Sequence, residues 1–323
     1  MAQTVLRCEH VSTFFPVRGS LGQVTGQVQA VKDVSLSLEK GKTYGLVGES
    51  GCGKSTLGRT LIRLLEPSEG SICLFDEDIS HLPERDMRRF RRRMQMAFQD
   101  PYTSLNPRIR VGDALMEVLK IHGVTSRDER MEAALEMLQR VGLLKEHFYK
   151  YPHEFSGGQR QRIGLCRALM LSPEILICDE PVSALDVSIQ SQIINLLCSL
   201  QDERHLSYLF ISHDMGVIRY ISDTVGVMYL GHLVEEGSAD EIFSHPLHPY
   251  TRMLLSAVPA LDPHADAKRM RIQGELPSPL NPPTGCVFHT RCPYATAQCA
   301  QAVPSLQDQG GGHMCACLRA TEI

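Results

Sequence analysis

Residues 48–56 carry the clearest chemical signal in the chain, and their sequence is GESGCGKST. Gly48, Gly53, Lys54 and Ser55 have the spacing of a phosphate-binding loop. Glycines are needed in such a loop because its backbone N–H groups must turn inward around phosphate oxygens. Lys54 can then reach the outer phosphates, and the Ser55 hydroxyl can hold Mg²⁺. The loop predicts a nucleotide site of the kind found in kinases, GTPases and motors.

The sequence on either side of this loop supports the same interpretation. Residues 43–47 (TYGLV) predict a short buried strand, and residues 56–65 predict an apolar helix. The N-terminus of that helix would add its dipole to an anion site. The predicted loop residues are Gly48, Glu49, Ser50, Gly51, Cys52, Gly53, Lys54, Ser55 and Thr56.

Two acidic residues follow a second apolar segment. Residues 175–178 (ILIC) have the length and composition of a buried strand, and Asp179, Glu180 and Pro181 come directly after them. The carboxyl ends of parallel strands are where α/β sheets place their chemistry. In a phosphate-loop protein, Asp179 is expected to support Mg²⁺ and Glu180 to orient and polarise a water molecule. A helix-capping acid is the alternative, and two acids in tandem beside a proline fit it poorly.

Gln99 and His213 each stand where a predicted strand ends. Gln99 ends the hydrophobic stretch that begins at residue 94, so it would face whatever the sheet presents; a solvent-exposed loop amide is the alternative. His213 follows the buried strand predicted at residues 207–212. A lone histidine is usually structural, but at this place in a nucleotide-hydrolysing protein it is a candidate for sensing a terminal phosphate.

A glycine pair precedes another apolar helix, which is predicted at residues 163–171. The stretch 155–162 reads FSGGQRQR, and Ser156, Gly157 and Gly158 would present backbone N–H groups at a helix entrance. Such groups form an anion site. A plain helix cap, with Ser156 as the capping oxygen, is the alternative.

Aromatic residues close the first predicted strand. Phe14 and Phe15 precede Pro16, which places them at the turn out of that strand. An aromatic ring there could stack on an adenine. Packing into the core is an equally good explanation from the sequence alone.

Eleven cysteines are present, and their distribution is uneven. Six are scattered, mostly inside apolar runs, where a small buried thiol is ordinary. The other five are Cys286, Cys292, Cys299, Cys315 and Cys317, which follow the proline-rich residues 276–285. Disulfides are not expected in a reducing compartment, so this cluster suggests a metal. The spacing is too wide for common zinc modules, and it suits an iron–sulfur cluster as well as a tetrahedral metal; unligated thiols are the third alternative.

The elements that must position these residues define an α/β fold with two appended parts. Alternating segments before residue 40, separated by glycine-rich residues 19–26, predict a twisted antiparallel hairpin whose buried side includes Val31, Val34, Leu36 and Leu38. Helical periodicity fills residues 108–170. Residues 224–229 and 232–236 predict an edge hairpin, and a composition shift ends the core near residue 260. The predicted domains are therefore residues 1–260, with a helical subdomain at about 100–170, and a loop-rich extension at 261–323.

Composition excludes several classes of protein. The chain has 323 residues, is 43% hydrophobic and carries a formal net charge of −4, so it can form a proper core and gives no general reason to expect nucleic-acid binding. The basic run at residues 85–93 is best interpreted as a solvated helix face. No apolar stretch approaches a membrane span, and the first residues lack a signal-peptide core, so we expect a cytoplasmic protein that reaches a membrane only through partners.

Six motifs occur along the chain in an order that resembles the ATP-binding subunits of ABC transporters. They are GESGCGKST, Gln99, FSGGQRQR, ILICDEP, SALD and His213. The stretches QDPYTSLNPR, HPYTRMLLSAVP and GELPSPLNPPTGC resemble the oligopeptide/dipeptide importer branch, and specifically the second of its two ATPase subunits. The resemblance covers essentially the whole chain and implies a P-loop NTPase core with a parallel sheet, an N-terminal antiparallel β subdomain, an α-helical signature subdomain and a cysteine-containing extension.

The resemblance also implies a role for each candidate residue. Phe15 would stack on adenine, Lys54 and the loop amides would hold the β- and γ-phosphates, and His213 would contact the γ-phosphate. Glu180 would be the general base. The Mg²⁺ ligands would be Ser55, Gln99 and Asp179. The signature residues, which would bind the ATP held by a second subunit, are Ser156, Gly157, Gly158 and Gln159. Phe155 replaces the more usual leucine. The ligands of a four-iron four-sulfur cluster would be Cys286, Cys292, Cys299 and Cys317, which leaves Cys315 spare.

The same resemblance implies partners and a place in the cell. It predicts a second ABC ATPase subunit in a heterodimer, two membrane permease subunits and an extracytoplasmic peptide-binding protein, with the chain at the cytoplasmic face of the inner membrane. The cargo would be dipeptides or oligopeptides, with nickel, heme or an antimicrobial peptide as alternatives. A soluble regulatory or repair ATPase is less well matched, because such proteins usually carry two cassettes or a long coiled coil. A cysteine tail that senses redox state and gates the ATPase is a further alternative.

Overall fold

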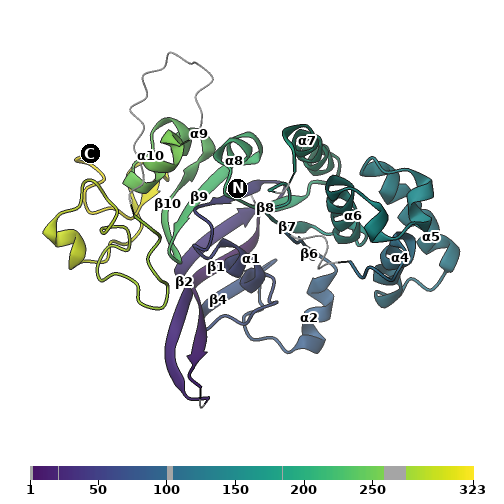
Figure 1. Cartoon of the computed structure of the whole chain (residues 1–323), viewed down its shortest axis with the longest axis horizontal. Coiled ribbons are helices and arrows are strands. Elements are labelled where there is room, and N and C mark those ends of the chain that lie inside the picture. Colours follow the sequence, from purple (N-terminus) through teal and green to yellow (C-terminus); the bar gives the residue numbers. More distant parts are fainter. Residues whose placement is uncertain (1–2, 21, 100–104, 184, 258–273) are drawn as a thin grey trace. The chain divides into compact units, whose positions relative to one another are not determined.

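The computed structural model describes residues 3–20, 22–99, 105–183, 185–257 and 274–323 (Figure 1). These residues form two compact units. The carboxylate unit consists of residues 1–3, 39–42 and 82–210, and the phosphate-loop unit of residues 4–38, 43–81 and 211–323. The predicted domain boundary near residue 260 lies outside the described residues.

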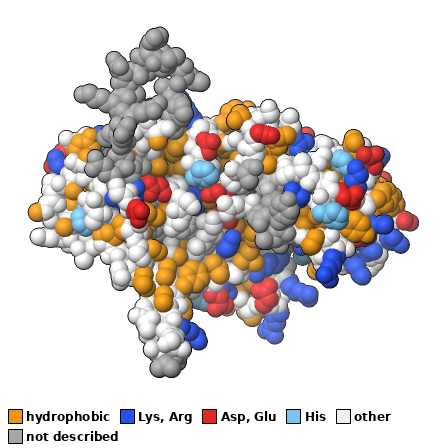
Figure 2. Space-filling view, in the orientation of Figure 1, with side chains coloured by type: hydrophobic (Ala, Val, Ile, Leu, Met, Phe, Trp, Pro, Cys, Tyr) orange, Lys and Arg blue, Asp and Glu red, His pale blue; other side chains and the backbone are white. Residues whose placement is uncertain are grey.

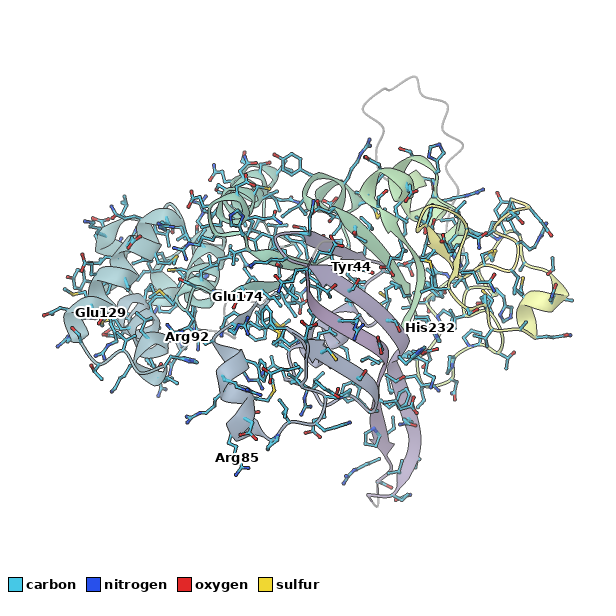
Figure 3. The ribbon with its side chains drawn as sticks, turned by 180° about the vertical axis from the view of Figure 1, so that it is seen from behind. Tyr44, Arg85, Arg92, Glu129, Glu174 and His232 are labelled. Atoms are coloured by element: carbon cyan, nitrogen blue, oxygen red, sulfur yellow. The ribbon has the colours of Figure 1, made fainter. Side chains whose placement is uncertain are left out.

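The larger sheet of the phosphate-loop unit has the strand order β11-β12-β10-β9-β3. Its strands are β3 (Thr43–Val47), β9 (Thr224–Tyr229), β10 (His232–Ser238), β11 (Gln307–Asp308) and β12 (Met314–Cys315). Strands β3 and β9 are parallel, and the other pairs are antiparallel. All five residues of β3 are buried, including Tyr44, which Figure 3 labels. A continuous apolar run of this kind forms a strand that is covered on both faces.

The hairpin predicted at residues 224–236 is confirmed as β9 and β10, but its predicted position at a sheet edge is wrong. Strand β9 pairs with β3 on its other side, and β10 pairs with β12. Strand β12 has only two residues, Met314 and Cys315, so no periodic pattern in the sequence could show that it covers β10.

A second sheet of the same unit has the order β2-β1-β4-β5. Its strands are β1 (Thr4–Arg18), β2 (Val24–Glu39), β4 (Glu69–Leu74) and β5 (Glu77–Asp78). The predicted hairpin is confirmed, since β1 and β2 are neighbours and the four residues predicted on its buried side, Val31, Val34, Leu36 and Leu38, are at most 4% exposed. The end of the first strand was predicted too early, because β1 continues through Phe15 and Pro16 to Arg18. The glycine-rich separation predicted from residue 19 is confirmed, and Gly19 N–H donates to the Gln23 carbonyl there at 2.8 Å.

The helices of the phosphate-loop unit are α1 (Lys54–Leu61), α8 (Met215–Ile221), α9 (Ala239–Ser244) and α10 (Pro249–Ser256), with a short 3₁₀ helix η3 (Ala297–Ala300). Helix α1 was predicted at residues 56–65; it begins at Lys54 and ends earlier because Arg63 adopts a left-handed conformation with φ of 57°. Helix α8 is capped by Asp214, whose carboxylate accepts from the N–H groups of Gly216 and Val217.

The carboxylate unit has three neighbouring strands in the order β6-β7-β8. They are β6 (Met94–Ala97), β7 (Ile175–Asp179) and β8 (Ser207–Ser212), and β6 and β7 are parallel. The remaining elements are α2 (Glu84–Arg91), α4 (Val111–Ile121), α5 (Arg127–Arg140), η1 (Lys145–Tyr149), η2 (Pro152–Glu154), α6 (Gly157–Leu169) and α7 (Val187–Arg204). Figure 1 shows α4, α5 and α6 together in teal, as the predicted helical subdomain requires.

The basic run is confirmed as a solvated helix. It forms α2, which buries only Met87 and Phe90. Arg85 is exposed and points away from the ribbon in Figure 3, and Figure 2 shows Lys and Arg side chains gathered along the lower edge, where Figure 1 draws α2. Arg93, just after the helix, pairs with Glu174 at 2.5 Å.

A buried carboxylate joins the C-terminal residues to the sheet of the phosphate-loop unit. Glu235 of β10 has no exposed surface, and its oxygens accept from the N–H groups of Leu247 at 2.6 Å and His248 at 3.0 Å. His313 Nε2 lies 2.8 Å from the same carboxylate. This hydrogen bond raises the pKa of His313, and the negative charges of Glu235, Glu241 and Asp308 add to the effect.

We expect the free energy of unfolding to fall with rising pH because of His313. A histidine whose pKa is raised by folding stabilises the fold fully below its unfolded pKa of about 6.5, and this stabilisation is lost as pH rises through the folded pKa. Thermal unfolding measured at several pH values checks this against His313→Gln, whose amide can still donate but does not titrate. An unchanged pH slope in that variant would contradict the prediction.

Candidate nucleotide site

The phosphate loop joins β3 to α1, as the sequence predicts. Lys54 is only 4% exposed, and its Nζ donates to the carbonyl oxygens of Gly48 at 2.7 Å and Glu49 at 2.9 Å. The ammonium group therefore lies over the loop that it is predicted to serve. Ser55 and Thr56 follow it in the first turn of α1, where helix dipole and hydroxyl group favour an anion and its counter-ion.

Close backbone approach explains two of the loop glycines. A Cβ atom on Gly53 would lie 2.1 Å from the carbonyl oxygen of Ala30, and a Cβ on Gly48 would lie 2.1 Å from that of Met228. Gly53 also has a φ of 106°, which side chains rarely tolerate. Nothing lies within 4 Å of a Cβ on Gly51, so that position demands glycine through its φ of 81° alone.

We expect Gly53→Ala to destabilise the protein by at least ~2 kcal/mol and to abolish ATP binding, because left-handed strain and a backbone clash coincide. Gly164→Ala is the matched control: it lies inside α6, and its Cβ would have no neighbour within 4 Å. Thermal unfolding and ATP titration of both variants check this. A Gly53→Ala protein that binds ATP normally would contradict the assigned loop geometry.

Two residues that the sequence did not single out as chemical, Tyr250 and Arg291, bind Glu49 of the loop, and a third, Tyr229, binds Arg291. Tyr250 accepts a hydrogen bond from the Glu49 backbone N–H at 2.8 Å. Arg291 donates through both terminal nitrogens to the Glu49 carboxylate, at 2.7 and 3.0 Å, and also to the Tyr229 hydroxyl at 3.3 Å. Few signals in the sequence pointed to them: Tyr250 belongs to the HPYT stretch, Tyr229 to an apolar strand, and Arg291 to residues 286–323, the cysteine-rich segment.

The tandem acids lie at the end of β7 in the carboxylate unit, as predicted. Asp179 has no exposed surface, and Glu180 adopts a φ of 46°, a left-handed conformation that turns the chain sharply out of the strand. Gln99 Nε2 donates to Glu180 Oε2 at 2.9 Å, so two of the predicted residues are brought together across 81 positions of sequence. The Ser183 hydroxyl donates to the Glu180 carbonyl at 3.2 Å and steadies the turn.

Phe15 and His213 occupy exposed positions in the phosphate-loop unit. Phe15 is 38% exposed on β1, so simple core packing does not account for it. Its neighbour Phe14 lies under the Lys32 ammonium, 5.0 Å from the ring centre. His213 is exposed between the end of β8 and the start of α8. Both side chains are accessible to a ligand.

The signature residues form the first turn of α6. The helix was predicted from residue 163, but it begins at Gly157, because Ser156 and Gln159 form a capping box in which each side chain accepts from the other's backbone N–H. Ser156 and Gly157 are exposed. Phe155 is buried and contacts His147 edge to face, with ring centres 5.2 Å apart. Phe155, which replaces the usual leucine, therefore packs inside the protein.

Four of the clustered cysteines line one small cavity in the phosphate-loop unit. They are Cys286, Cys292, Cys299 and Cys317, and Cys315 lies apart from them in β12. Burial raises the pKa of Cys286 to about 11, with the other three thiols adding to the shift, and burial also raises the pKa of Cys292 and Cys317. In the described part of the chain, no group of three or more His, Cys, Asp or Glu side chains is arranged to hold a metal ion.

Each unit therefore carries part of the predicted chemistry. The phosphate-loop unit holds residues 48–56, Phe15, His213 and the cysteine cavity, and the carboxylate unit holds Gln99, Asp179, Glu180 and the signature. Among the residues that the structure describes, no helix combines the length and the hydrophobicity that crossing a bilayer requires.

Comparison with known proteins places this geometry in a family. Residues 31–183 match the ABC transporter family, and residues 234–299 match the oligopeptide/dipeptide transporter C-terminal region. The chain is 53% identical to the oligopeptide transport ATP-binding protein AppF of Bacillus subtilis, over 98% of this chain and 97% of AppF. It is 51% identical to the di/tripeptide transport ATP-binding protein DppF of Pseudomonas aeruginosa, over 94% of each.

A solved structure supports the fold. The ATP-binding cassette MJ0796, in a dimeric post-hydrolysis state bound to ADP and Pi, superposes with a TM-score of 0.66 and 26% identity over 72% of this chain and 98% of the cassette. The predicted fold class, a P-loop NTPase core with helical subdomain and C-terminal extension, is thereby confirmed. The chain belongs to the ABC transporter family of ATP-binding proteins, in the branch that carries the oligopeptide/dipeptide transporter C-terminal region.

Proposed function

We propose that this chain is the ATP-hydrolysing subunit of an ABC importer for dipeptides or oligopeptides. The observation that carries the proposal is the intact phosphate loop, in which Lys54 donates to the Gly48 carbonyl. The chain that carries this loop is similar over 94–98% of its length to peptide-transport ATP-binding proteins. A complex purified with its membrane subunits should hydrolyse ATP faster when peptide and binding protein are added. Stimulation by nickel or heme, and none by peptide, would assign a different cargo.

Each candidate residue has a proposed task. Lys54 and the loop amides would hold the outer phosphates, Phe15 would stack on adenine and His213 would contact the γ-phosphate. Ser55, Gln99 and Asp179 would supply the hard oxygen donors that Mg²⁺ prefers, and bound Mg²⁺ would neutralise phosphate charge. Because the Gln99 amide nitrogen donates to Glu180, its amide oxygen is left as the group for an ion. Glu180 would accept the proton of the attacking water.

The signature implies that ATP is held between two ATPase subunits. Ser156, Gly157, Gly158 and Gln159 would bind the γ-phosphate of ATP on a partner, so a single chain would contain two half-sites. The exposed capping box at the start of α6 supports this, since its helix terminus faces solvent in the isolated chain. We propose a second ABC ATPase subunit as the partner, in a heterodimer. Turnover that stays linear in enzyme down to nanomolar concentration, with no partner present, would contradict this.

A groove beside Gln99 supports docking to a membrane subunit. Residues of β6, α4 and α6 line about 250 Å³ in the carboxylate unit, and Phe98 and Ile121 expose 38% and 66% of their surfaces there. Exposed apolar groups around a concave surface are typical of protein interfaces. We propose that one of two permease subunits binds at this surface, that an extracytoplasmic peptide-binding protein completes the importer, and that the chain works at the cytoplasmic face of the inner membrane. Co-purification with solubilised membrane proteins, lost on Ile121→Glu, tests the docking.

We also propose a four-iron four-sulfur cluster as a resident cofactor. The four thiols that line one cavity supply the kind and number of donors that such a cluster needs, although the described residues do not hold them around a metal position. Burial disfavours the thiolate forms of Cys286, Cys292 and Cys317, repulsion from neighbouring thiols adds to this, and a bound cation would relieve both effects. Anaerobically purified protein should be brown and contain iron and acid-labile sulfide, and Cys292→Ser should lose both while Cys315→Ser keeps them. Colourless protein with stoichiometric zinc would contradict the proposal.

A further inference from the structure

Arg291 and Glu49 form a buried, two-pronged ion pair between the cysteine-rich segment and the phosphate loop. The two terminal nitrogens of Arg291 lie 2.7 and 3.0 Å from the two carboxylate oxygens of Glu49. The Arg291 side chain is 6% exposed and that of Glu49 is 24% exposed. Hydrogen bonding to Glu49 raises the pKa of Arg291, so the guanidinium stays charged. Parallel N–H···O bonds of this kind fix orientation as well as adding energy.

Glu49 connects this ion pair to the residues that would bind phosphate. Its backbone N–H donates to the Tyr250 hydroxyl at 2.8 Å, and its backbone carbonyl accepts from Lys54 Nζ at 2.9 Å. Glu49 is therefore held at its carboxylate, its N–H and its carbonyl, and the last of these contacts is to the lysine of the loop. A movement of Glu49 would move the acceptor on which the Lys54 ammonium rests.

Arg291 is itself held by a cluster of aromatic side chains. Its backbone N–H donates to the Phe288 carbonyl at 3.0 Å, and Phe288 has no exposed surface. The Phe288 ring contacts the rings of Tyr229 and Tyr250, with centres 5.1 and 5.4 Å apart. Because these rings fix the turn that carries Arg291, the guanidinium is positioned before any nucleotide arrives.

The ion pair between Arg291 and Glu49 also changes the charge that the phosphate loop presents to ATP. Glu49 places a carboxylate in a loop that has to accept a polyanion, and an uncompensated negative charge there would repel ATP. Arg291 cancels that charge in a largely buried setting, where charges are poorly screened. An ion pair whose sole role was to attach the cysteine-rich segment to the fold could involve any nearby acidic residue. This ion pair instead involves Glu49, which belongs to the phosphate loop.

We infer that Arg291 is a positioning residue for ATP, acting through Glu49 on the phosphate loop and on Lys54. The cysteine-rich segment thereby contributes to the nucleotide site. This inference rests on the proposed binding of ATP by residues 48–56.

The test measures the affinity of the full-length protein for fluorescent ATP and ADP analogues, together with thermal unfolding. Arg291→Gln leaves Glu49 uncompensated, and we expect ATP to bind about tenfold more weakly, which corresponds to about 1.4 kcal/mol. ADP affinity should fall less, because ADP carries less negative charge. Glu49→Gln in the Arg291→Gln background should restore ATP affinity to within about threefold of wild type, since the repelling charge is then gone.

Matched variants separate this role from a purely structural one. Arg319→Gln removes another cation of the same segment, one that pairs with Glu322 at 2.7 Å, and should leave ATP affinity unchanged. If Arg291→Gln does not purify, Arg291→Lys serves, since it keeps the charge and loses the two-pronged geometry; we expect about threefold weaker ATP binding.

Two results would overturn the inference. One is ATP affinity in Arg291→Gln, or in the lysine variant, equal to wild type. The other is a double variant as weak as Arg291→Gln alone, since that would mean Glu49's charge plays no part. If Lys54→Ala also bound ATP normally, the proposed function of the loop would have failed instead, so the two failures are distinguishable.

Discussion

Glu180→Gln is expected to lower ATP turnover by about 10²–10⁴ while ATP binding persists, because this is the usual contribution of a general base. The substitution keeps the shape of the side chain, and an amide oxygen can still accept the hydrogen bond that Gln99 Nε2 now gives to the carboxylate at 2.9 Å. What it removes is the ability to take a proton from water. Steady-state turnover and ATP affinity, measured on the assembled complex, separate the two effects.

Glu174→Gln is the control for this experiment. Glu174 lies just before the other end of the same strand, β7, where Figure 3 labels it, and it pairs with Arg93 at 2.5 Å. Both groups of that pair are about 40% exposed, so its loss should cost less than about 1 kcal/mol of stability and leave turnover unchanged. Wild-type turnover in Glu180→Gln would show that another group accepts the proton.

Lys54→Ala is expected to weaken ATP binding by at least about thirtyfold, because truncating one partner of a buried charge interaction costs about 2–5 kcal/mol. The ammonium is buried over the loop, and the variant leaves the carbonyl oxygens of Gly48 and Glu49 without it. Isothermal titration with ATP measures the loss. Thermal unfolding should change far less, since burying an ammonium group is itself unfavourable.

Arg59→Ala provides the comparison on the same helix. Arg59 is an exposed cation in the last turn of α1, and its removal should alter ATP affinity by less than about threefold, because exposed charges are screened by salt. An equal loss of ATP affinity in Lys54→Ala and Arg59→Ala would mean that positive charge in general attracts ATP, and that the position of Lys54 in the loop is not important.

Strands with continuous apolar sequence were the part of the fold that the sequence predicted best. The predictions at residues 43–47 and 207–212 coincide with β3 and β8, because such runs are bounded by polar residues on both sides. Helix α6 began earlier than predicted, since Gly157 and Gly158 have poor helix propensity and the capping box overrides it. Propensity is a weak guide wherever a specific side chain closes the helix end.

The candidate site also has features that the sequence predicts and features that only the folded chain reveals. The loop and the tandem acids could be predicted because each is contiguous in sequence. The contact between Gln99 and Glu180 spans 81 residues, and that between Arg291 and Glu49 spans 242, so only the folded chain brings them together. The left-handed backbone of Glu180 is also invisible in sequence, because glutamate has no preference for that conformation.

Strand β12 has a consequence for how the protein is made. His313 and Glu235 are 78 residues apart, so β10 leaves the ribosome well before the segment that covers its outer side. At ordinary rates of synthesis this interval lasts roughly 4–16 seconds. Throughout it, β10 presents an open row of backbone donors and acceptors, and an unpaired strand edge invites pairing with other chains. The growing chain is therefore most exposed to misassembly after its nucleotide loop has been made and before the cysteine-rich segment has followed.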